Sequence, residues 1–224
     1  MGGIGALLRK VDFSGNPYLG VFAASNDGAV IASPSVPAKA VRRVEEALGV
    51  RAIRMNIGGS SLVGSLLALN SKAVLLTTFA RDEEIAKLAG LEAYVLEHRL
   101  NAVGNNVLVN DHGALCHPGY GRRAVEELQD VFGVEVHRGT LGGQKTVGSA
   151  GVVTNKGAVC HPHATDEELA VVEEVLKVKP LIATANYGTP QLGACVVAND
   201  GGAVTGTPTT PIELGRIEEG LRLY

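Results

Sequence analysis

The chain has 224 residues, of which 46% are hydrophobic and 19% are charged, and its formal net charge is −3. This composition supplies a packed core and excludes an intrinsically disordered chain. The near balance of charge argues against a protein held to nucleic acid mainly by neutralising phosphates, and three cysteines do not make a disulfide framework, which favours a reducing compartment.

The first residues do not predict a targeting segment. Gly2 is placed as in a myristoylation signal, but Ala6 stands where that signal needs Ser or Thr. Residues 4–8 are too short an apolar stretch for the core of a signal peptide. No apolar run approaches the ~20 residues of a membrane helix. We therefore expect a soluble, cytoplasmic protein without membrane contact.

One pattern occurs five times along the chain: a glycine in an apolar run, a short polar turn and a second apolar run. The five segments are residues 18–34, 62–78, 102–118, 146–162 and 191–208. Their anchor glycines are Gly20, Gly64, Gly104, Gly148 and Gly193, which are 44, 40, 44 and 45 residues apart. Such a period indicates repeated supersecondary units. Turns such as Asn26-Asp27-Gly28 predict a β-hairpin in each, and the second turn fits least well because Lys72 replaces the glycine.

A helix is predicted after each hairpin. In four repeats, apolar residues at i, i+3 and i+7 form one stripe. These residues are Val41, Val44 and Leu48; Val125, Leu128 and Phe132; Leu169, Val172 and Leu176; and Leu214, Ile217 and Leu221. The second repeat has only Ile85 and Leu88, so its helix should be shorter. Thr165 with Glu168 and Thr210 with Glu213 predict capping boxes, and Gly49, Gly90 and Gly133 predict helix ends.

A third strand is predicted after each of the first four helices, at residues 50–56, 91–97, 134–138 and 180–183. The fifth helix is followed by the chain end, whereas residues 4–11 form a strand without a unit of its own. We therefore expect this strand to complete the fifth unit and close a ring. The predicted fold is a single α/β domain, 1–224, a five-bladed pseudosymmetric ring of ββαβ repeats 12–56, 57–97, 98–138, 139–183 and 184–224.

Charged residues suggest two different surfaces. Acidic pairs such as Glu45-Glu46, Glu83-Glu84 and Glu167-Glu168 lie on predicted helices, where a solvated outer face is expected. The loops before the anchor glycines contain no acidic residue and carry five cations: Arg51, Arg54, Arg99, Arg138 and Lys145. Such a basic loop face suits a protein or ribonucleoprotein partner. Solvated loops without a partner remain the alternative.

Two Cys-His pairs raise the question of catalysis or metal binding. Cys116-His117-Pro118 and Cys160-His161-Pro162 recur 44 residues apart, and His163 follows. Neighbouring strand residues point to opposite faces, so strand-end residues with a structural role are favoured over a zinc site or a Cys/His nucleophile pair. Cys195 lies in an apolar run and is expected in the core.

Two glycine-rich stretches imitate phosphate-binding loops. Residues 59–65 lack a lysine, and in residues 139–146 Gln144 replaces the second glycine before Lys145. Both precede a predicted strand, so no helix N-terminus is available to hold phosphate. We expect neither a nucleotide site nor a cofactor, and no catalytic apparatus.

The run Met55-Asn56-Ile57-Gly58-Gly59-Ser60-Ser61-Leu62-Val63-Gly64-Ser65 and the segments 102–106, 146–149, 153–157 and 192–195 resemble the archaeal translation initiation factor 6 family. The resemblance implies a five-bladed α/β propeller, the pentein fold. It further implies a monomeric, non-catalytic factor of initiation and ribosome biogenesis that binds the large (50S) ribosomal subunit and prevents its association with the small (30S) subunit. The implied contact is ribosomal protein uL14 near the sarcin–ricin loop. Release is implied to need an elongation-factor-like GTPase and a Shwachman–Bodian–Diamond family protein.

The matching family motif implies that Asn105 binds the ribosome, whereas a turn residue that satisfies its own backbone is the alternative for this position. From the basic loop face, five more residues are predicted at the interface: Arg54, Asn56, Ser65, Arg99 and Asn101. An alternative function is a pentein-fold guanidino-modifying hydrolase or amidinotransferase that uses Cys116 or Cys160. A protein-interaction ring unrelated to ribosomes is a third hypothesis.

Overall fold

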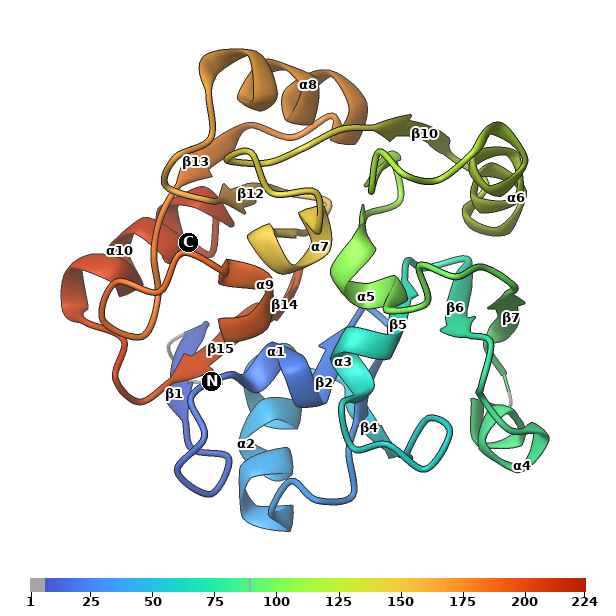
Figure 1. Cartoon of the computed structure of the whole chain (residues 1–224). Coiled ribbons are helices and arrows are strands. Elements are labelled where there is room, and N and C mark those ends of the chain that lie inside the picture. Colours follow the sequence, from blue (N-terminus) through green and yellow to red (C-terminus); the bar gives the residue numbers. More distant parts are fainter. Residues whose placement is uncertain (1–6, 89) are drawn as a thin grey trace.

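The computed structural model describes residues 7–88 and 90–224. In this part of the chain, five mixed α/β units follow one another around a common centre (Figure 1), and each contains one small three-stranded sheet. We number the units 1 to 5 in chain order. The arrangement agrees with the five predicted ββαβ repeats.

Each sheet combines an antiparallel hairpin with a third strand that runs parallel to its neighbour. In units 1 and 2 the strands are β2 (Ala23–Ser25), β3 (Ala29–Ala32), β4 (Arg51–Arg54), β5 (Leu67–Leu69), β6 (Ala73–Thr77) and β7 (Glu92–Leu96). In units 3 and 4 they are β8 (Val107–Val109), β9 (Gly113–Cys116), β10 (Glu135–Arg138), β11 (Gly151–Val153), β12 (Ala158–Cys160) and β13 (Pro180–Ile182).

Unit 5 contains strands from both ends of the chain. Its hairpin is β14 (Val196–Asn199) and β15 (Gly202–Gly206), and its third strand is the N-terminal β1 (Leu8–Val11). Leu8 pairs with Ala203 and Val11 with Gly206 in parallel register. The predicted completion of unit 5 by the N-terminal strand is therefore confirmed for residues 8–11, whereas residues 4–6 of that prediction lie outside the described residues.

Each hairpin is followed by a helix, as predicted. Four of these helices are α2 (Ala38–Leu48), α6 (Arg122–Phe132), α8 (Asp166–Leu176) and α10 (Pro211–Gly220). The helix of unit 2 is shorter, as expected, because α4 (Asp82–Ile85) continues only as a 3-10 turn over Ala86–Leu88. Thr165 and Thr210 form the two predicted capping boxes, and Gly49 and Gly133 end their helices with φ of 70° and 67°.

The long helices bury their apolar stripes at the joints between units. Helix α2 packs on β15 and β1 of unit 5, where Val44 and Leu48 join Val204 in one buried cluster. Helix α8 likewise packs on β9 of unit 3, and α10 packs on β13 of unit 4. Burial of each large apolar side chain contributes about 1.5–3 kcal/mol. The core is therefore divided among the joints, and neighbouring units stabilise each other.

In each unit, a single helical turn replaces the first half of the strand that was predicted before the hairpin turn. These five short helices are α1 (Leu19–Phe22), α3 (Val63–Leu66), α5 (Val103–Asn106), α7 (Val147–Ala150) and α9 (Leu192–Cys195). A short apolar run does not distinguish a strand from a buried helical turn, which is why the pattern was misread. The prediction that a strand follows the two glycine-rich stretches is wrong for the same reason, since α3 and α7 follow them.

The anchor glycines lie in these short helices, at close contact between units. A Cβ atom added at Gly64 would overlap the carbonyl oxygen of Gly20, and one added at Gly104 would overlap that of Gly64. The same relation joins Gly148 to Gly104 and Gly193 to Gly148, and a Cβ atom at Gly20 would overlap the carbonyl oxygen of Gly193. Each anchor position therefore requires glycine because a neighbouring backbone occupies the space of a side chain.

Asparagine side chains tie the hairpin turns of neighbouring units together. The Nδ2 of Asn110 donates to the carbonyl oxygens of Thr154, at 3.1 Å, and of Leu176, the last residue of α8, at 2.9 Å. Asn70 and Asn199 make the equivalent pairs of bonds, and Asn26 donates to the turn of unit 2. All four side chains are buried. Each donor thus satisfies buried carbonyl groups of the neighbouring unit, which fixes the turns relative to one another.

Three glutamates hold the loops that precede the short helices. The carboxylate of Glu84 accepts hydrogen bonds from the amides of Gly58 and Gly59, at 2.6 and 3.0 Å. Glu168 binds the amides of Gly142 and Gly143, at 2.7 and 3.1 Å. In unit 5, Glu213 binds two amides of the corresponding turn, those of Tyr187 and Gly188.

These contacts correct the prediction that the acidic pairs lie on a solvated outer face. Glu84 is buried and Glu168 is half-buried, and both belong to such pairs. Burial by itself raises the pKa of Glu168, but hydrogen bonds from the Thr140 hydroxyl and from three backbone amides outweigh it and lower this pKa below 4.5. The glutamate side chains therefore serve as ionised anchors for the loops.

Replacement of an anchor glycine should destabilise the protein. In Gly104→Ala the new methyl group meets backbone atoms of unit 2, and we expect a loss of about 3 kcal/mol in the free energy of unfolding, the upper range of overpacking. Denaturant unfolding measures this loss. Gly215→Ala in α10 is the control, because among the described residues nothing beyond the helix's own backbone lies within 4 Å of the new Cβ, and the variant should be neutral or stabilising. Equal stability of the two variants would contradict the proposed role of the contact.

The glutamate anchors predict acid sensitivity. Because the pKa of Glu168 is lower in the folded than in the unfolded chain, its contribution is complete above pH 4.5 and is lost as the pH falls through the folded pKa. Glu168→Gln should cost about 1–3 kcal/mol at neutral pH and flatten the decline in melting temperature below pH 5. The exposed Glu174→Gln on the same helix is the control. Identical pH profiles for Glu168→Gln and the unmodified chain would count against this anchor.

Candidate functional site

The five short helices and the loops that lead into them form one surface around the centre, which we call the short-helix face (Figure 1). On this face, each anchor glycine is followed by one half-buried residue. In units 1 to 5 these residues are Val21, Ser65, Asn105, Ser149 and Ala194. The turns of the hairpins lie at the opposite ends of the same strands. The fold therefore presents two separate faces.

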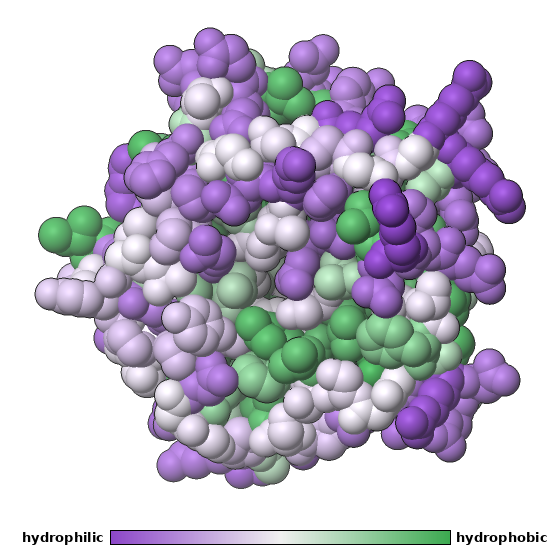
Figure 2. Space-filling view, viewed as in Figure 1, coloured by the Kyte–Doolittle hydropathy of each residue, from purple (hydrophilic) through white to green (hydrophobic). Residues whose placement is uncertain are grey.

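Three exposed apolar side chains lie on the short-helix face at units 1 and 2, and Tyr187, in the loop before α9, is exposed at unit 5. Tyr18, Leu62 and Phe79 expose 42%, 43% and 41% of their surface. Figure 2, in the same view as Figure 1, shows an apolar patch over α1 and α3. Tyr18 and Leu62 directly precede these two helices, and Phe79 packs against Gly58 in the loop before α3. An exposed patch of this kind is typical of a protein-binding surface.

The structure brings Ser65 and Asn105 together on neighbouring short helices, because α3 and α5 are in contact. The amide of Asn105 donates to the Ala102 carbonyl, but within the described part of the chain its side chain has no hydrogen-bond partner. The next residue differs: Asn106 is buried, and its side chain donates to the Leu100 carbonyl. The Asn105 side chain is therefore free to bind a partner.

The other predicted residues lie at the end of β4 or in the loops that precede the short helices. Asn56 follows β4 and is half-buried, Arg99 is exposed, and Asn101 is half-buried just before α5. Arg54 is exposed, but its guanidinium donates to the carbonyl oxygens of Pro34 and Val36, at 2.7 and 2.5 Å. This side chain therefore fixes the loop before α2 in addition to presenting a charge.

Arg51 does not lie on the predicted basic loop face. Arg51 pairs with Ala29 at one end of β4, whereas Arg54 pairs with Ala32 at the other end. Because β3 begins at the hairpin turn, Arg51 lies at the turn end of its unit. The sequence placed both arginines near one loop but did not give the strand register that separates them. Phe79 was missed because it lies in a loop after a hairpin rather than before an anchor glycine.

The cysteines are placed as core residues. Cys116 and Cys160 are the last residues of β9 and β12, and all three cysteines are fully buried, which confirms the prediction for Cys195. Burial raises the pKa of the Cys116 and Cys160 thiols to about 12 and that of Cys195 to about 11. Because the thiolate is the nucleophile, these pKa values disfavour the hydrolase alternative.

The histidines beside these cysteines take part in local turns. The Nδ1 of His117 accepts a hydrogen bond from the Gly119 amide, and that of His161 accepts one from His163. Burial, followed by the charges of Lys145 and His98, lowers the pKa of His117. In residues 7–88 and 90–224 no three His, Cys, Asp or Glu side chains converge as metal ligands, and no helix there could span a membrane.

The glycine-rich stretches do not have free phosphate-binding amides. The left-handed turns at Gly58-Gly59 and Gly142-Gly143 point their amides at the carboxylates of Glu84 and Glu168. An incoming phosphate would have to displace an ionised side chain from each turn.

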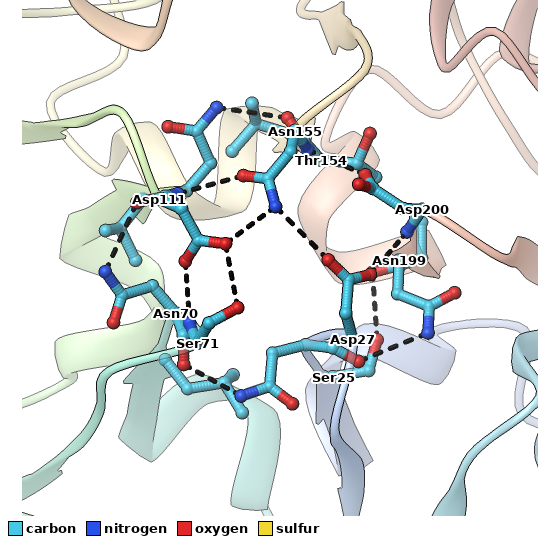
Figure 3. A pocket seen from close by; sticks show the side chains of 15 residues that line it. Ser25, Asp27, Asn70, Ser71, Asp111, Thr154, Asn155, Asn199 and Asp200 are labelled. Carbon is cyan, nitrogen blue, oxygen red and sulfur yellow. Dashed lines mark hydrogen bonds between the residues drawn. The ribbon is translucent and has the colours of Figure 1, made fainter.

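The space at the centre of the five units is nearly filled at the turn end. Figure 3 shows the turn side chains around a pocket of about 30 Å³. The Nδ2 of Asn155 donates to Asp27 and to Asp111, at 3.2 and 2.7 Å, and the carboxylate of Asp27 accepts the amide of Asp200. Burial, with the charges of Asp200 and Asp111, raises the pKa of Asp27. A pocket of this size is far below the roughly 300 Å³ of an ordinary small-molecule site.

Comparison with known proteins gives one consistent result. The model of the eIF-6 family matches residues 8–220. A protein from Methanosarcina mazei named Translation initiation factor 6 is 43% identical, over 96% of this chain and 98% of its own length. Proteins of the same name from Pyrococcus abyssi and Thermoplasma acidophilum are 39% and 34% identical over 96% of this chain and cover 99% and 100% of their own lengths. Since the family match spans nearly the whole chain, the protein belongs to the eIF-6 family.

Proposed function

We propose that this protein is a cytoplasmic translation initiation factor of archaeal type. It binds the large (50S) ribosomal subunit and prevents association with the small (30S) subunit, in initiation and in ribosome biogenesis. The observation that carries this proposal is the family match over residues 8–220, supported by relatives named Translation initiation factor 6.

The proposed fold is a single closed domain, residues 1–224, with the repeat boundaries predicted from the sequence. We assign it to the five-bladed α/β propellers, the pentein fold. Two contacts support closure: β1 completes the sheet of unit 5, and Gly20 of unit 1 packs on Gly193 of unit 5. Together they join the first unit to the last one.

The proposed ribosome-binding surface is the short-helix face at units 1 to 3. It comprises Arg54, Asn56, Ser65, Arg99, Asn101 and Asn105. The apolar patch of Tyr18, Leu62 and Phe79 would bury its exposed surface against ribosomal protein uL14, and the cations would face nearby RNA of the sarcin–ricin loop. A core of apolar contacts with a polar and charged rim is the usual composition of a specific interface.

The proposed mechanism is steric competition without a chemical step. A specific interface buries about 800 Å² on each partner, which is less than a tenth of the 9863 Å² exposed by this protein. One face is therefore sufficient for binding, and the bulk of the ring lies over the joining surface. The free energy of binding then sets how strongly subunit joining is suppressed.

Release from the subunit is proposed to need other proteins. The two glycine-rich turns are bound by Glu84 and Glu168, so neither can couple nucleotide hydrolysis to dissociation. An elongation-factor-like GTPase and a Shwachman–Bodian–Diamond family protein would supply that step. We propose that the factor itself acts as a monomer without a cofactor.

The first prediction from this function concerns subunit joining. Purified protein should cosediment with isolated archaeal 50S subunits and, at saturation, reduce the yield of 70S ribosomes formed with 30S subunits. Sucrose-gradient sedimentation measures both effects. An undiminished yield of joined ribosomes at saturating protein would refute the anti-association function, and failure to cosediment would refute binding itself.

The second prediction concerns Asn105. Asn105→Lys places a long side chain at the proposed interface and should weaken 50S binding at least tenfold. Its melting temperature should stay close to that of the unmodified chain, because the half-buried Asn105 side chain makes no hydrogen bond within residues 7–88 and 90–224. Ala194→Lys, at the equivalent position of unit 5, is the matched control and should bind normally. Equal affinity of both variants would remove Asn105 from the interface.

A further inference from the structure

A large concave pocket lies between units 4 and 5, at the turn end of the ring. It has a volume of about 660 Å³. Four of its lining residues are cationic: Lys156, Lys177, Lys179 and Arg222. We call it the basic pocket. Lys156 lies in the turn between β11 and β12, Lys177 and Lys179 follow α8, and Arg222 follows α10. Because α7 is at the other end of β11, this pocket is separate from the short-helix face.

The charge of the basic pocket differs from that of the chain as a whole. Glu173 is its only acidic lining residue, so four cations face one carboxylate in a protein of formal charge −3. Within residues 7–88 and 90–224, the side chains of Lys177, Lys179 and Arg222 have no hydrogen-bond or ion-pair partner. The amine of Lys156 donates to the Asp200 carbonyl, which positions it at the edge of the pocket.

The corresponding pocket of unit 1 shows that this excess is not a general property of the helix ends. It lies at the end of α2 and is lined by Arg42, Arg51, Glu45 and Glu46, so its charges cancel. A cation near a helix C-terminus is favourable because of the helix dipole. In the basic pocket, four cations gather beside only two helix ends, those of α8 and α10.

Two of the cations also occupy unusual backbone positions. The left-handed residue after the helix is Gly49 in unit 1 and Gly133 in unit 3, but it is Lys177 in unit 4 and Arg222 in unit 5, with φ of 55° and 53°. Glycine adopts this conformation without steric cost, whereas a residue with a Cβ atom is strained there. The two units that line the basic pocket thus carry long cationic side chains where the fold itself favours glycine.

The lining indicates the chemistry of the partner. The apolar lining residue, Val178, is only 5% exposed, so the pocket offers little to an apolar side chain or to a stacked base. Lysines act as point charges for phosphate, and the planar guanidinium of Arg222 can bind two phosphate oxygens at once. We propose that the basic pocket binds the phosphate backbone of RNA without reading its bases.

This inference does not rest on the proposed 50S binding, because it uses a different face and is tested with isolated RNA. The probe is a fluorescein-labelled 12-nucleotide oligouridylate, titrated with the full-length protein and followed by fluorescence anisotropy from 50 to 200 mM KCl. If four cations neutralise phosphates, a plot of log affinity against log salt should have a slope of about −3, from roughly −0.7 for each phosphate on a single strand.

The informative variant is Lys177→Asn/Lys179→Gln, which removes two charges and leaves a residue that tolerates the left-handed conformation. It should bind the RNA at least tenfold more weakly at 50 mM KCl, with a slope reduced to about −1.4. The control, Arg42→Gln/Arg51→Gln, removes the same charge from the neutral pocket of unit 1 and should stay within twofold of the unmodified protein.

Three results would overturn the proposal. One is a failure of the unmodified protein to bind the RNA, and another is an equal loss of affinity in the variant and its control. The third is displacement of the RNA by a hexaglutamate peptide at equal charge concentration, which would identify an acidic protein segment as the partner. Melting curves of both variants establish that loss of binding does not arise from unfolding.

Discussion

The five anchor glycines hold the units together through close contacts between their backbones. Each of them occupies space beside a neighbouring carbonyl group that a side chain would fill, from Gly20 on Gly193 to Gly64 on Gly20. This packing sets the separation of the units and turns each glycine segment into one helical turn. The buried asparagines then fix the hairpin turns at the other end of the strands. With both ends tied, the loops between units have little freedom, and carboxylates such as Glu168 hold them in place.

The proposed binding surface follows from this constraint. The residue after each anchor glycine lies on the short-helix face in every unit. Differences among these five residues therefore make the units chemically unequal on that face. Ser65 and Asn105 are polar, Val21 is apolar, and the apolar patch of Tyr18, Leu62 and Phe79 lies at units 1 and 2. Tyr187, Ile212 and Tyr224 are exposed in unit 5. The basic pocket lies at the other end of the strands, between units 4 and 5. The pseudosymmetric scaffold therefore carries two asymmetric surfaces, and each is proposed for a different kind of contact.

The sequence predicted those features that depend on residues close to one another along the chain. The repeat period, the apolar stripe of α2 and the capping box at Thr165 are examples, as is the short helix of unit 2. The four-residue helices were not predicted, because the contact that bends the chain at Gly64 comes from a different unit. The end of the unit at which Arg51 lies depends on the register of β4 against β3. The burial of Glu84 depends on its contact with the turn at Gly58, which is far from it in sequence. For the proposed interface, the sequence predicted positions, and the fold adds that Ser65 and Asn105 lie on helices that are in contact.

We propose that the short-helix face, rather than the turn end, lies against the large ribosomal subunit. Hydrogen–deuterium exchange with mass spectrometry, on the protein alone and bound to 50S subunits, tests it most directly. We expect slower exchange on binding in residues 55–66 and 97–106, with unchanged exchange in the turns at residues 154–157 and 199–202. Protection confined to those turns, with residues 97–106 unaffected, would show that the opposite face binds the subunit.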